Sequence, residues 1–431
     1  MSLPPLTQHP LRHTIAGEVH ARPYEPLDGA WRVSHLALVT GELPPGTETA
    51  LIGDLLRRFG RAGPGPEAVY LTVDLGPFRL RWERHTEFST WTFLVSGLPG
   101  DAADPFAAPA LARVPEDWLA QLPGKLLVGL HVVLDPAPCT AEQAAPLFGG
   151  RIVGSRVGGD AGAVFTDFLL AADGFGRALV VSDGMTPGLA GRTLQRVLEL
   201  ETYRLMALLA LPPARETAPR LTVIEQGVSA AMAHLAEDDG DAGRDRRLLS
   251  RLTSLAAENE RLLSGLSYRL SASRAYYAIV QRAVDDLRED RIEGLQTIAE
   301  FLARRLAPAM RTCDYVGARM EALSKRLTRA GDMLRTRVDI GLNENNRDLL
   351  HSMNKRAELQ LRLQETVEGL SVVAISYYVL GLVGYIAKGL KEAGLSPVKP
   401  EVAVLGAVPL VLGLVFIGVR RLRRAVVKHG D

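Results

Sequence analysis

This sequence has little cysteine and almost no net charge. Its 431 residues include two cysteines, Cys139 and Cys313, which are too far apart for a zinc-binding spacing or a disulfide framework. Its 50 Lys and Arg residues nearly balance its 49 Asp and Glu residues, so the formal net charge is +1. We therefore expect a reducing compartment for most of the chain. We expect no nucleic-acid partner, since no global field attracts one.

Recognised catalytic motifs are also missing. The sequence contains no Gly-x-Ser-x-Gly, Cys-x-x-Cys or His-Glu-x-x-His. VGGDAG near Gly158 has neither the spacing of a dinucleotide fingerprint nor the lysine of a P-loop. The opening residues, MSLPPLTQHPLRH, lack the apolar region of a signal peptide, so we expect the residues before the apolar end to stay in the cytoplasm. Nothing in the sequence specifies an enzyme, and no cofactor is expected.

Alternating apolar and polar residues between Trp31 and Val181 predict a series of β-strands. Gly76-Pro77 and the segment 173–176 lie between such strands and are typical of tight turns. Strands joined by short turns favour a mostly antiparallel sheet, and the interspersed helices make the domain α+β. We therefore predict a cytoplasmic α+β domain over residues 1–213. The predicted strands are 31–40, 68–75, 78–85, 88–97, 125–135, 164–172 and 177–183.

Basic residues alternate with apolar ones in one of these strands. Arg79, Arg81 and Arg84 stand against Phe78, Leu80 and Trp82, as a half-exposed strand requires. The basic side chains form either a solvated face, which we favour, or a site for an anionic ligand. Three histidines, His35, His85 and His131, lie in strand-like runs, where half-buried structural histidines are expected.

After Pro187 the apolar residues follow a helical period. One helix is predicted to end at Pro212-Pro213, and a second to cover about 220–235. A helical bundle or stalk is placed over 214–365, and Pro308 is expected to break or kink it. Either the helices form an antiparallel bundle with Asn259 as a polar core residue, or Asn259 fixes the register of a coiled-coil contact. The accompanying heptad leucines are Leu248, Leu252, Leu255, Leu262 and Leu266.

Two uncharged apolar runs lie near the end of the sequence, at about 370–387 and 402–419. Each has about the 17–25 residues that cross a hydrocarbon core roughly 30 Å thick. One such run is compatible with a buried core helix. Two of them, followed by a basic tail, predict a two-helix transmembrane hairpin over 366–420. Small residues that allow close helix packing occur in both runs, at Gly381, Gly384, Gly406 and Gly413.

Basic residues directly after the second run predict the orientation of this hairpin. They are Arg420, Arg421, Arg423 and Arg424. Because positive charge favours the cytoplasmic side, we expect the tail, 421–431, to be cytoplasmic. Two spans return both termini to one side. We therefore predict a multi-pass protein of the cytoplasmic (inner) membrane, with the lipid bilayer as its partner.

Two signatures carry a family resemblance. His9-Pro10-Leu11-Arg12 is followed by Glu18-Val19-His20-Ala21-Arg22-Pro23, and Thr366-Val367-Glu368-Gly369-Leu370-Ser371 leads into the first apolar run. The combination resembles an uncharacterised family of bacterial membrane-anchored proteins over essentially the whole chain. Because that family is a domain of unknown function, the resemblance implies a location and no activity.

The order of the predicted segments is similar to that of the CorA-type divalent-cation channels. Those channels also combine a cytoplasmic α/β domain, a long stalk helix, a C-terminal hairpin and a basic tail. Their selectivity filter is a Gly-Met-Asn motif at the outer end of the first span. This sequence has Gly384-Tyr385-Ile386 there, and the loop lysines Lys388, Lys391 and Lys399 repel a dication.

The N-terminal histidines allow a structural and a chemical interpretation. On a helix, His9 and His13 are four residues apart and could share a metal ion. In the interpretation that we favour, Leu11, Ile15 and Val19 pack on the domain, and no metal is bound.

We therefore predict a membrane-anchored, non-catalytic homo-oligomer that couples a cytoplasmic domain to a membrane hairpin, with a CorA-like ion conduit or its regulator as the concrete version. The alternatives are a membrane-tethered, metal-assisted enzyme that uses His9 and His13, and a scaffold that recruits a cytoplasmic protein partner.

Overall fold

The computed structural model describes residues 8–12, 15, 24–99, 104–236, 242–394 and 397–427, without the side chains of 242 and 422–427. The chain divides into two compact units. The first contains Met1–Ala236 and Ser250–Gly331, and the second contains Glu237–Leu249 and Asp332–Asp431. Each unit is described below by itself.

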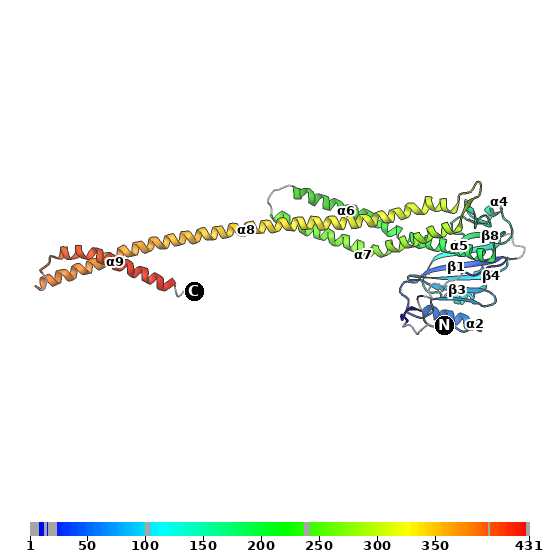
Figure 1. Ribbon diagram of the computed structural model, residues 1–431, viewed down its shortest axis with the longest axis horizontal. Helices are drawn as coiled ribbons and strands as arrows, with labels where there is room; N and C mark the ends of the chain where they lie inside the picture. The colour runs from blue at the N-terminus through cyan, green and yellow to red at the C-terminus, as the bar shows by residue number, and fades with distance from the viewer. Residues whose placement is uncertain are drawn as a thin grey trace, which may run out of the picture. The chain divides into compact units, whose positions relative to one another are not determined.

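The first unit is built on one β-sheet, which has nine strands in the described residues (Figure 1). Their order across the sheet is β2-β3-β4-β1-β5-β8-β7-β6-β9. The turn at Gly76, where φ is +91°, joins β2 to β3, and this confirms the turn predicted there. The strands are β1 (Trp31–Val39), β2 (Tyr70–Asp74), β3 (Arg79–Arg84), β4 (Phe88–Ser96), β5 (Lys125–Asp135), β6 (Val153–Val157), β7 (Gly162–Thr166), β8 (Gly176–Val181) and β9 (Asp290–Arg291).

The sheet is mixed, which corrects the expectation of a mostly antiparallel sheet. Strand β5 pairs with β8 in parallel, with Leu130 opposite Gly176. The reason is a long connection through α4 (Ala141–Ala144) and η2 (Ala145–Leu147), which carries the chain from β5 past two strand positions to β6. The chain then returns antiparallel through β7 to β8, by a four-residue turn at 158–161 and a nine-residue loop at 167–175. Short turns therefore set the local pairings, and the crossover sets the parallel one.

An apolar core covers one face of the sheet. Helix α2 (Thr47–Arg58) packs there together with η1 (Ala110–Arg113) and α3 (Glu116–Leu119). Trp91 and Trp118 meet edge to face, with ring centroids 5.6 Å apart. Because alternate residues of a strand share a face, Leu80 and Trp82 of β3 also enter this core and are fully buried.

Helix α5 (Pro187–Leu208) packs on the opposite face (Figure 1). It begins where the Thr186 hydroxyl accepts a hydrogen bond from the Leu189 N–H, with Pro187 at the first helical position. Its buried residues include Leu194 and Leu198. The helix therefore forms the layer that covers this second face of the sheet.

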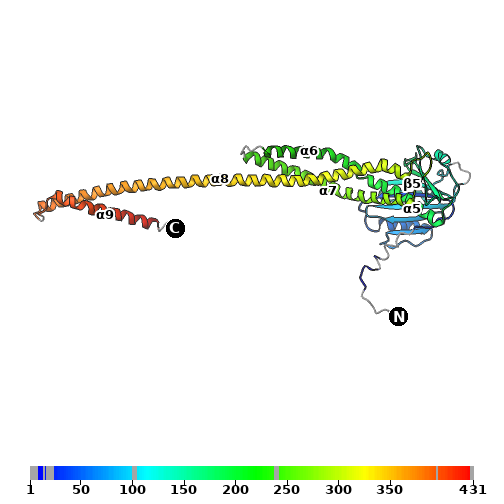
Figure 2. The ribbon, with the colours of Figure 1, turned by 45° about the horizontal axis from the view of Figure 1, so that its top comes forward.

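The long helices of the first unit form an antiparallel bundle, made by α6 (Leu211–Ala236), part of α7 (Ala242–Leu287) and the start of α8 (Ile298–Glu392) (Figures 1 and 2). Asn259 is fully buried in it, and its Nδ2 donates to the Met320 carbonyl at 3.2 Å. Leu252 and Leu266 are buried in the same chain. The bundle interpretation of Asn259 is confirmed, and the contact between chains is not needed to bury this residue.

Prolines begin or lie within helices here instead of ending them. Pro212 and Pro213 stand in the first turn of α6, where a missing N–H costs no hydrogen bond, so the predicted break lies earlier, between α5 and α6. Helix α8 continues through Pro308, whose carbonyl accepts from the Thr312 hydroxyl at 3.0 Å. A break at Pro308 is therefore wrong, and a kink there stays a prediction.

The second unit contains the remainder of α8, α9 (Pro400–Val427) and the first residues of α7. Asp245 and Arg337 form an ion pair in it, with 3.1 Å between Oδ2 and Nε. Beyond that point, every residue from 342 to 367 is exposed. The predicted domain limits at 213 and 365 stay predictions.

Candidate functional site

A polar cavity lies between the sheet and α5 in the first unit. Its volume is about 140 Å³. Strands β1, β3 and β4 supply side chains from one wall, and α5 supplies the other. The lining residues are His35, Arg81, Glu83, His85, Thr90, Thr92, Gln195, Leu198, Glu199, Thr202 and Tyr203. Because most of these side chains form hydrogen bonds, the cavity fits water or a small polar molecule better than an apolar one.

His35 forms the inner wall of the cavity. Its Nδ1 lies 2.8 Å from the Thr92 hydroxyl, and its Nε2 lies 2.9 Å from the Thr202 hydroxyl on α5. Burial, together with the nearby charges of Arg81 and His85, lowers the pKa of His35 to about 3. The imidazole is therefore neutral, with one nitrogen donating and the other accepting.

Arg81 and Glu83 lie next to His35 and form a nearly buried ion pair, with side chains 11% and 10% exposed. Arg81 Nε donates to Glu83 Oε1 at 2.6 Å, and Nη1 donates to Gln195 Oε1 on α5 at 2.6 Å. The expected solvated face is therefore wrong for Arg81, because α5 covers it. Arg84, which the sequence places in the same basic set, points to the other face of the sheet. Its Nε lies 3.7 Å from Oε2 of Glu48 on α2.

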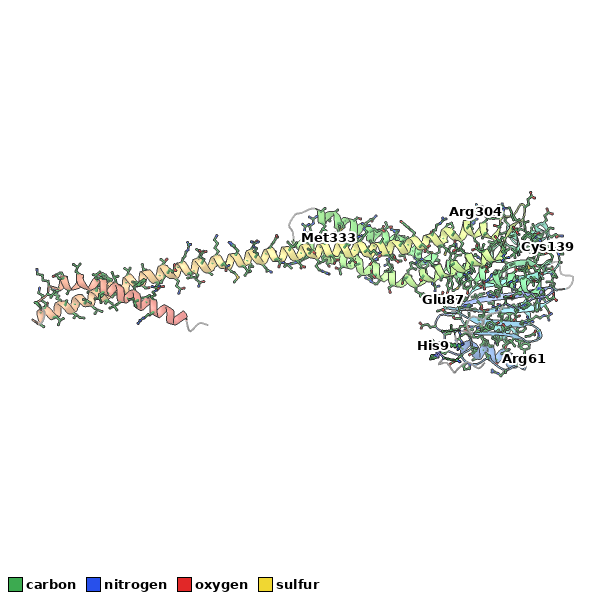
Figure 3. The ribbon with its side chains drawn as sticks, in the orientation of Figure 1. His9, Arg61, Glu87, Cys139, Arg304 and Met333 are labelled. Carbon is green, nitrogen blue, oxygen red and sulfur yellow. The ribbon has the colours of Figure 1, made fainter. Side chains whose placement is uncertain are left out.

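A second set of contacts holds α7 against the sheet near this cavity. Glu87 is 7% exposed, and its carboxylate accepts two hydrogen bonds from Arg269, at 3.0 and 2.6 Å. The Tyr276 hydroxyl donates to Glu87 Oε1 at 2.6 Å, and burial together with this carboxylate raises the pKa of Tyr276. Figure 3 labels Glu87 where the sheet meets the helices. This cluster is a structural clamp, because the side chains of Arg269 and Tyr276 both donate hydrogen bonds to the Glu87 carboxylate.

His131, on β5, is also structural. Its side chain is 5% exposed and stacks on Phe175, with ring centroids 4.3 Å apart. Its Nε2 lies 4.0 Å from Asp173, but burial outweighs that carboxylate and lowers the pKa of His131 to about 4. The contact is therefore not an ion pair at neutral pH, and both His35 and His131 are more deeply buried than expected.

The start of α8 is fixed to the sheet edge. Thr297 and Glu300 form a capping box, in which the Glu300 N–H donates to Thr297 Oγ1 and the Thr297 N–H donates to Glu300 Oε2. Ser155 of β6 accepts from the Ile298 N–H, and Glu289 accepts from the Ala299 N–H. Burial raises the pKa of Glu289. The first turn of α8 is thus hydrogen-bonded to the sheet and to its own cap.

Two helices in the described residues, α8 and α9, are long and apolar enough to cross a membrane by length and composition. Their apolar side chains are exposed, for example Tyr385 at 80% and Leu405 at 75%. A Cβ built at Gly384 lies 3.5 Å from Val404, so α8 and α9 approach closely there. Gly381, Gly406 and Gly413 have open space beside them, and Arg420, Arg421, Arg423 and Arg424 lie in α9. The length, composition and exposed apolar side chains of these helices support membrane association.

The N-terminal signature is described only in part. His9 is exposed, and its Nδ1 accepts from the Leu11 N–H at 3.2 Å, as a helix cap does. Leu11 and Ile15 are 54% and 60% exposed, so their predicted packing on the domain is wrong. Pro10 and Arg12 are also exposed. His13, Glu18, Val19, His20, Arg22 and Pro23 lie outside the described residues.

Metal-binding geometry does not occur in the described part of the chain: no three His, Cys, Asp or Glu side chains gather as ligands there. Both ring nitrogens of His35 bind threonine hydroxyls, and His131 Nδ1 lies 2.9 Å from the Ser34 hydroxyl. These nitrogens are therefore engaged as structural groups.

The fold and these sites define a class: a sheet domain with a helical bundle and two apolar C-terminal helices. The chain belongs to the family described as "Protein of unknown function (DUF3422)", whose match covers residues 7–426. This confirms the resemblance to an uncharacterised family. No curated protein matches the sequence.

The sequence analysis did not predict the cavity between the sheet and α5. One signal was present, because Arg81 and Glu83 share the strand face opposite Leu80 and Trp82, which are core residues. Alternation shows that two opposite charges lie on one face, but it does not show whether solvent or a helix covers that face.

Proposed function

We propose that this chain is a non-catalytic, membrane-anchored protein in which α8 connects the sheet domain to a hairpin in the bilayer. The single observation that supports the proposal best is the continuity of α8. Its first turn is hydrogen-bonded to the sheet at Ser155, and the same helix contains the first apolar run before it ends at Glu392. An uninterrupted helix carries displacement and rotation better than a flexible linker does.

The exposed apolar side chains of the hairpin support the bilayer as its surroundings. Residues such as Val373, Tyr377 and Leu414 are 65%, 76% and 62% exposed. An apolar surface of this kind is unfavourable in water and is typical of a lipid-facing helix. The proposed location is the cytoplasmic (inner) membrane, with both termini in the cytoplasm.

Membrane extraction tests the anchor. The full chain should stay with the membrane at high salt and high pH, and require detergent for release. Ile375→Arg combined with Leu414→Arg should weaken insertion, because arginine at the centre of a span costs about 3 kcal/mol on insertion scales. Leu361→Arg, outside both apolar runs, is the matched control and should leave extraction unchanged. Release of the unaltered chain by salt alone would overturn the proposal.

Cysteine labelling tests the topology. In a Cys139→Ser/Cys313→Ser background, Leu170→Cys and His429→Cys should be protected from an impermeant reagent in intact cells. Ala393→Cys, between the two apolar helices, should react. Labelling of either protected position from outside would refute the orientation.

Ion conduction, the CorA-like version, is a narrower proposal supported by architecture alone. Reconstituted protein with a divalent-cation indicator measures it directly. No observation on the described residues favours the metal-assisted enzyme.

A further inference from the structure

One stretch of α8 has exposed apolar side chains on which no other described segment packs. Every residue from 342 to 367 is exposed, and Figure 3 shows the side chains of α8 beyond Met333 standing away from the helix without neighbours over this stretch. Six apolar residues there and at its end are between 40% and 74% exposed: Leu342, Leu349, Met353, Leu363, Val367 and Leu370. A helix gains most of its stability from packing an apolar face, so this face requires a partner.

These six residues follow a heptad spacing. Steps of four and three residues from Leu342 give nine positions, which we call the seam: 342, 346, 349, 353, 356, 360, 363, 367 and 370. The other three seam residues are Asn346, Arg356 and Gln360. A seam that repeats every 3.5 residues matches another helix with the same repeat.

The charges of this stretch lie on the opposite side of the helix. Arg356 is the exception, and the positions that flank the seam, such as Leu350 and Leu359, are uncharged. The remaining charged residues between 342 and 370 all occupy the outer heptad positions: Glu344, Arg347, Asp348, Lys355, Glu358, Arg362, Glu365 and Glu368. A bilayer that surrounded the helix would also bury these charges, so this stretch does not lie within the hydrocarbon core.

We propose that the seam is a parallel, in-register coiled-coil contact between copies of this chain. A second copy supplies an identical seam with the same charge pattern. Asn346 occupies an a position, with Leu349 at the next d position, and an Asn at a pairs with its equivalent in a parallel, in-register coiled coil. Asn259 and the bundle leucines Leu252 and Leu266 are already buried within one chain, so they are not available for this contact. The contact does not depend on membrane anchoring.

Cysteine cross-linking of the full chain in mild detergent tests the seam and its direction. In the Cys139→Ser/Cys313→Ser background, Leu349→Cys and Leu363→Cys lie at d positions, where facing residues are close enough for a disulfide. Both should form disulfide-linked dimers under mild oxidation. His351→Cys and Glu358→Cys lie on the outer face and are the controls, which should stay mostly unlinked. These positions are exposed within the chain, so folding is not at risk.

Linking at both seam positions requires a parallel pair of helices, because in an antiparallel pair at most one of the two positions faces the same residue of the second copy.

Met353→Cys serves as a reporter for a second comparison. Adding Leu349→Glu and Leu363→Glu should abolish the Met353→Cys cross-link, whereas Leu361→Glu on the outer face should preserve it. The proposal is overturned by equal linking at seam and outer positions, by a cross-link that survives the two glutamates, or by a monomeric mass of the unaltered chain.

Discussion

Acid should weaken the sheet domain through His35. The pKa of His35 is lowered to about 3 in the folded protein, from 6.5 for an ordinary histidine. The native state therefore binds fewer protons than the unfolded state between these two values. The contribution of His35 to the free energy of unfolding is fully present above pH 6.5 and is lost as the pH falls toward 3. Between pH 7 and pH 4 the loss amounts to about 3 kcal/mol, since one pKa unit corresponds to about 1.4 kcal/mol.

Tryptophan fluorescence during urea unfolding measures this loss in the sheet domain alone. All four tryptophans, Trp31, Trp82, Trp91 and Trp118, lie in that part of the chain. His35→Gln should flatten the dependence of the unfolding free energy on pH by about 3 kcal/mol between pH 7 and pH 4.

A matched control separates the titration of His35 from a general loss of stability. Val33→Ala, in the same strand and buried to 1% exposure, should lower the free energy at every pH without changing the slope. His131, whose pKa is lowered to about 4, supplies a further slope that both variants retain. Equal slopes for His35→Gln and the unaltered chain would refute the reasoning.

Three substitutions test the packing of the first unit, each by urea unfolding. Gly191→Ala should cost about 1–3 kcal/mol, because a Cβ there would lie 1.9 Å from the Glu25 carbonyl, whereas Gly188→Ala on the same helix meets no backbone and should be nearly neutral. Asn259→Leu should be neutral or stabilising by up to about 1 kcal/mol, because the buried Oδ1 of Asn259 has no hydrogen-bond partner; a loss above about 2 kcal/mol would contradict this. Leu11→Ala should change stability by less than about 0.5 kcal/mol, since the side chain is exposed, and a larger loss would restore the packing interpretation.

Elements that depend only on residues adjacent in the sequence were predictable from it. Strands β1, β3 and β4 follow from alternation, and the turn at Gly76 follows from a residue that tolerates positive φ. The apolar runs near the end follow from length and composition alone. These features require no knowledge of which segments meet in space.

Features that depend on distant segments were not predictable in this way. The parallel pairing of β5 with β8 depends on where the connection before β6 places the chain. Whether Asn259 faces its own bundle or another chain depends on helix docking, because a heptad pattern satisfies both.

The candidate site shows the same division between local and tertiary information. The sequence by itself determined that Arg81 and Glu83 share a strand face and that His35 lies in an apolar strand. Only the tertiary structure decided that α5 covers that face, where Gln195 and Thr202 meet them. The physical reason is that alternation specifies the side of a strand, whereas the removal of water, and with it the lowered pKa of His35, depends on a segment far away in the chain.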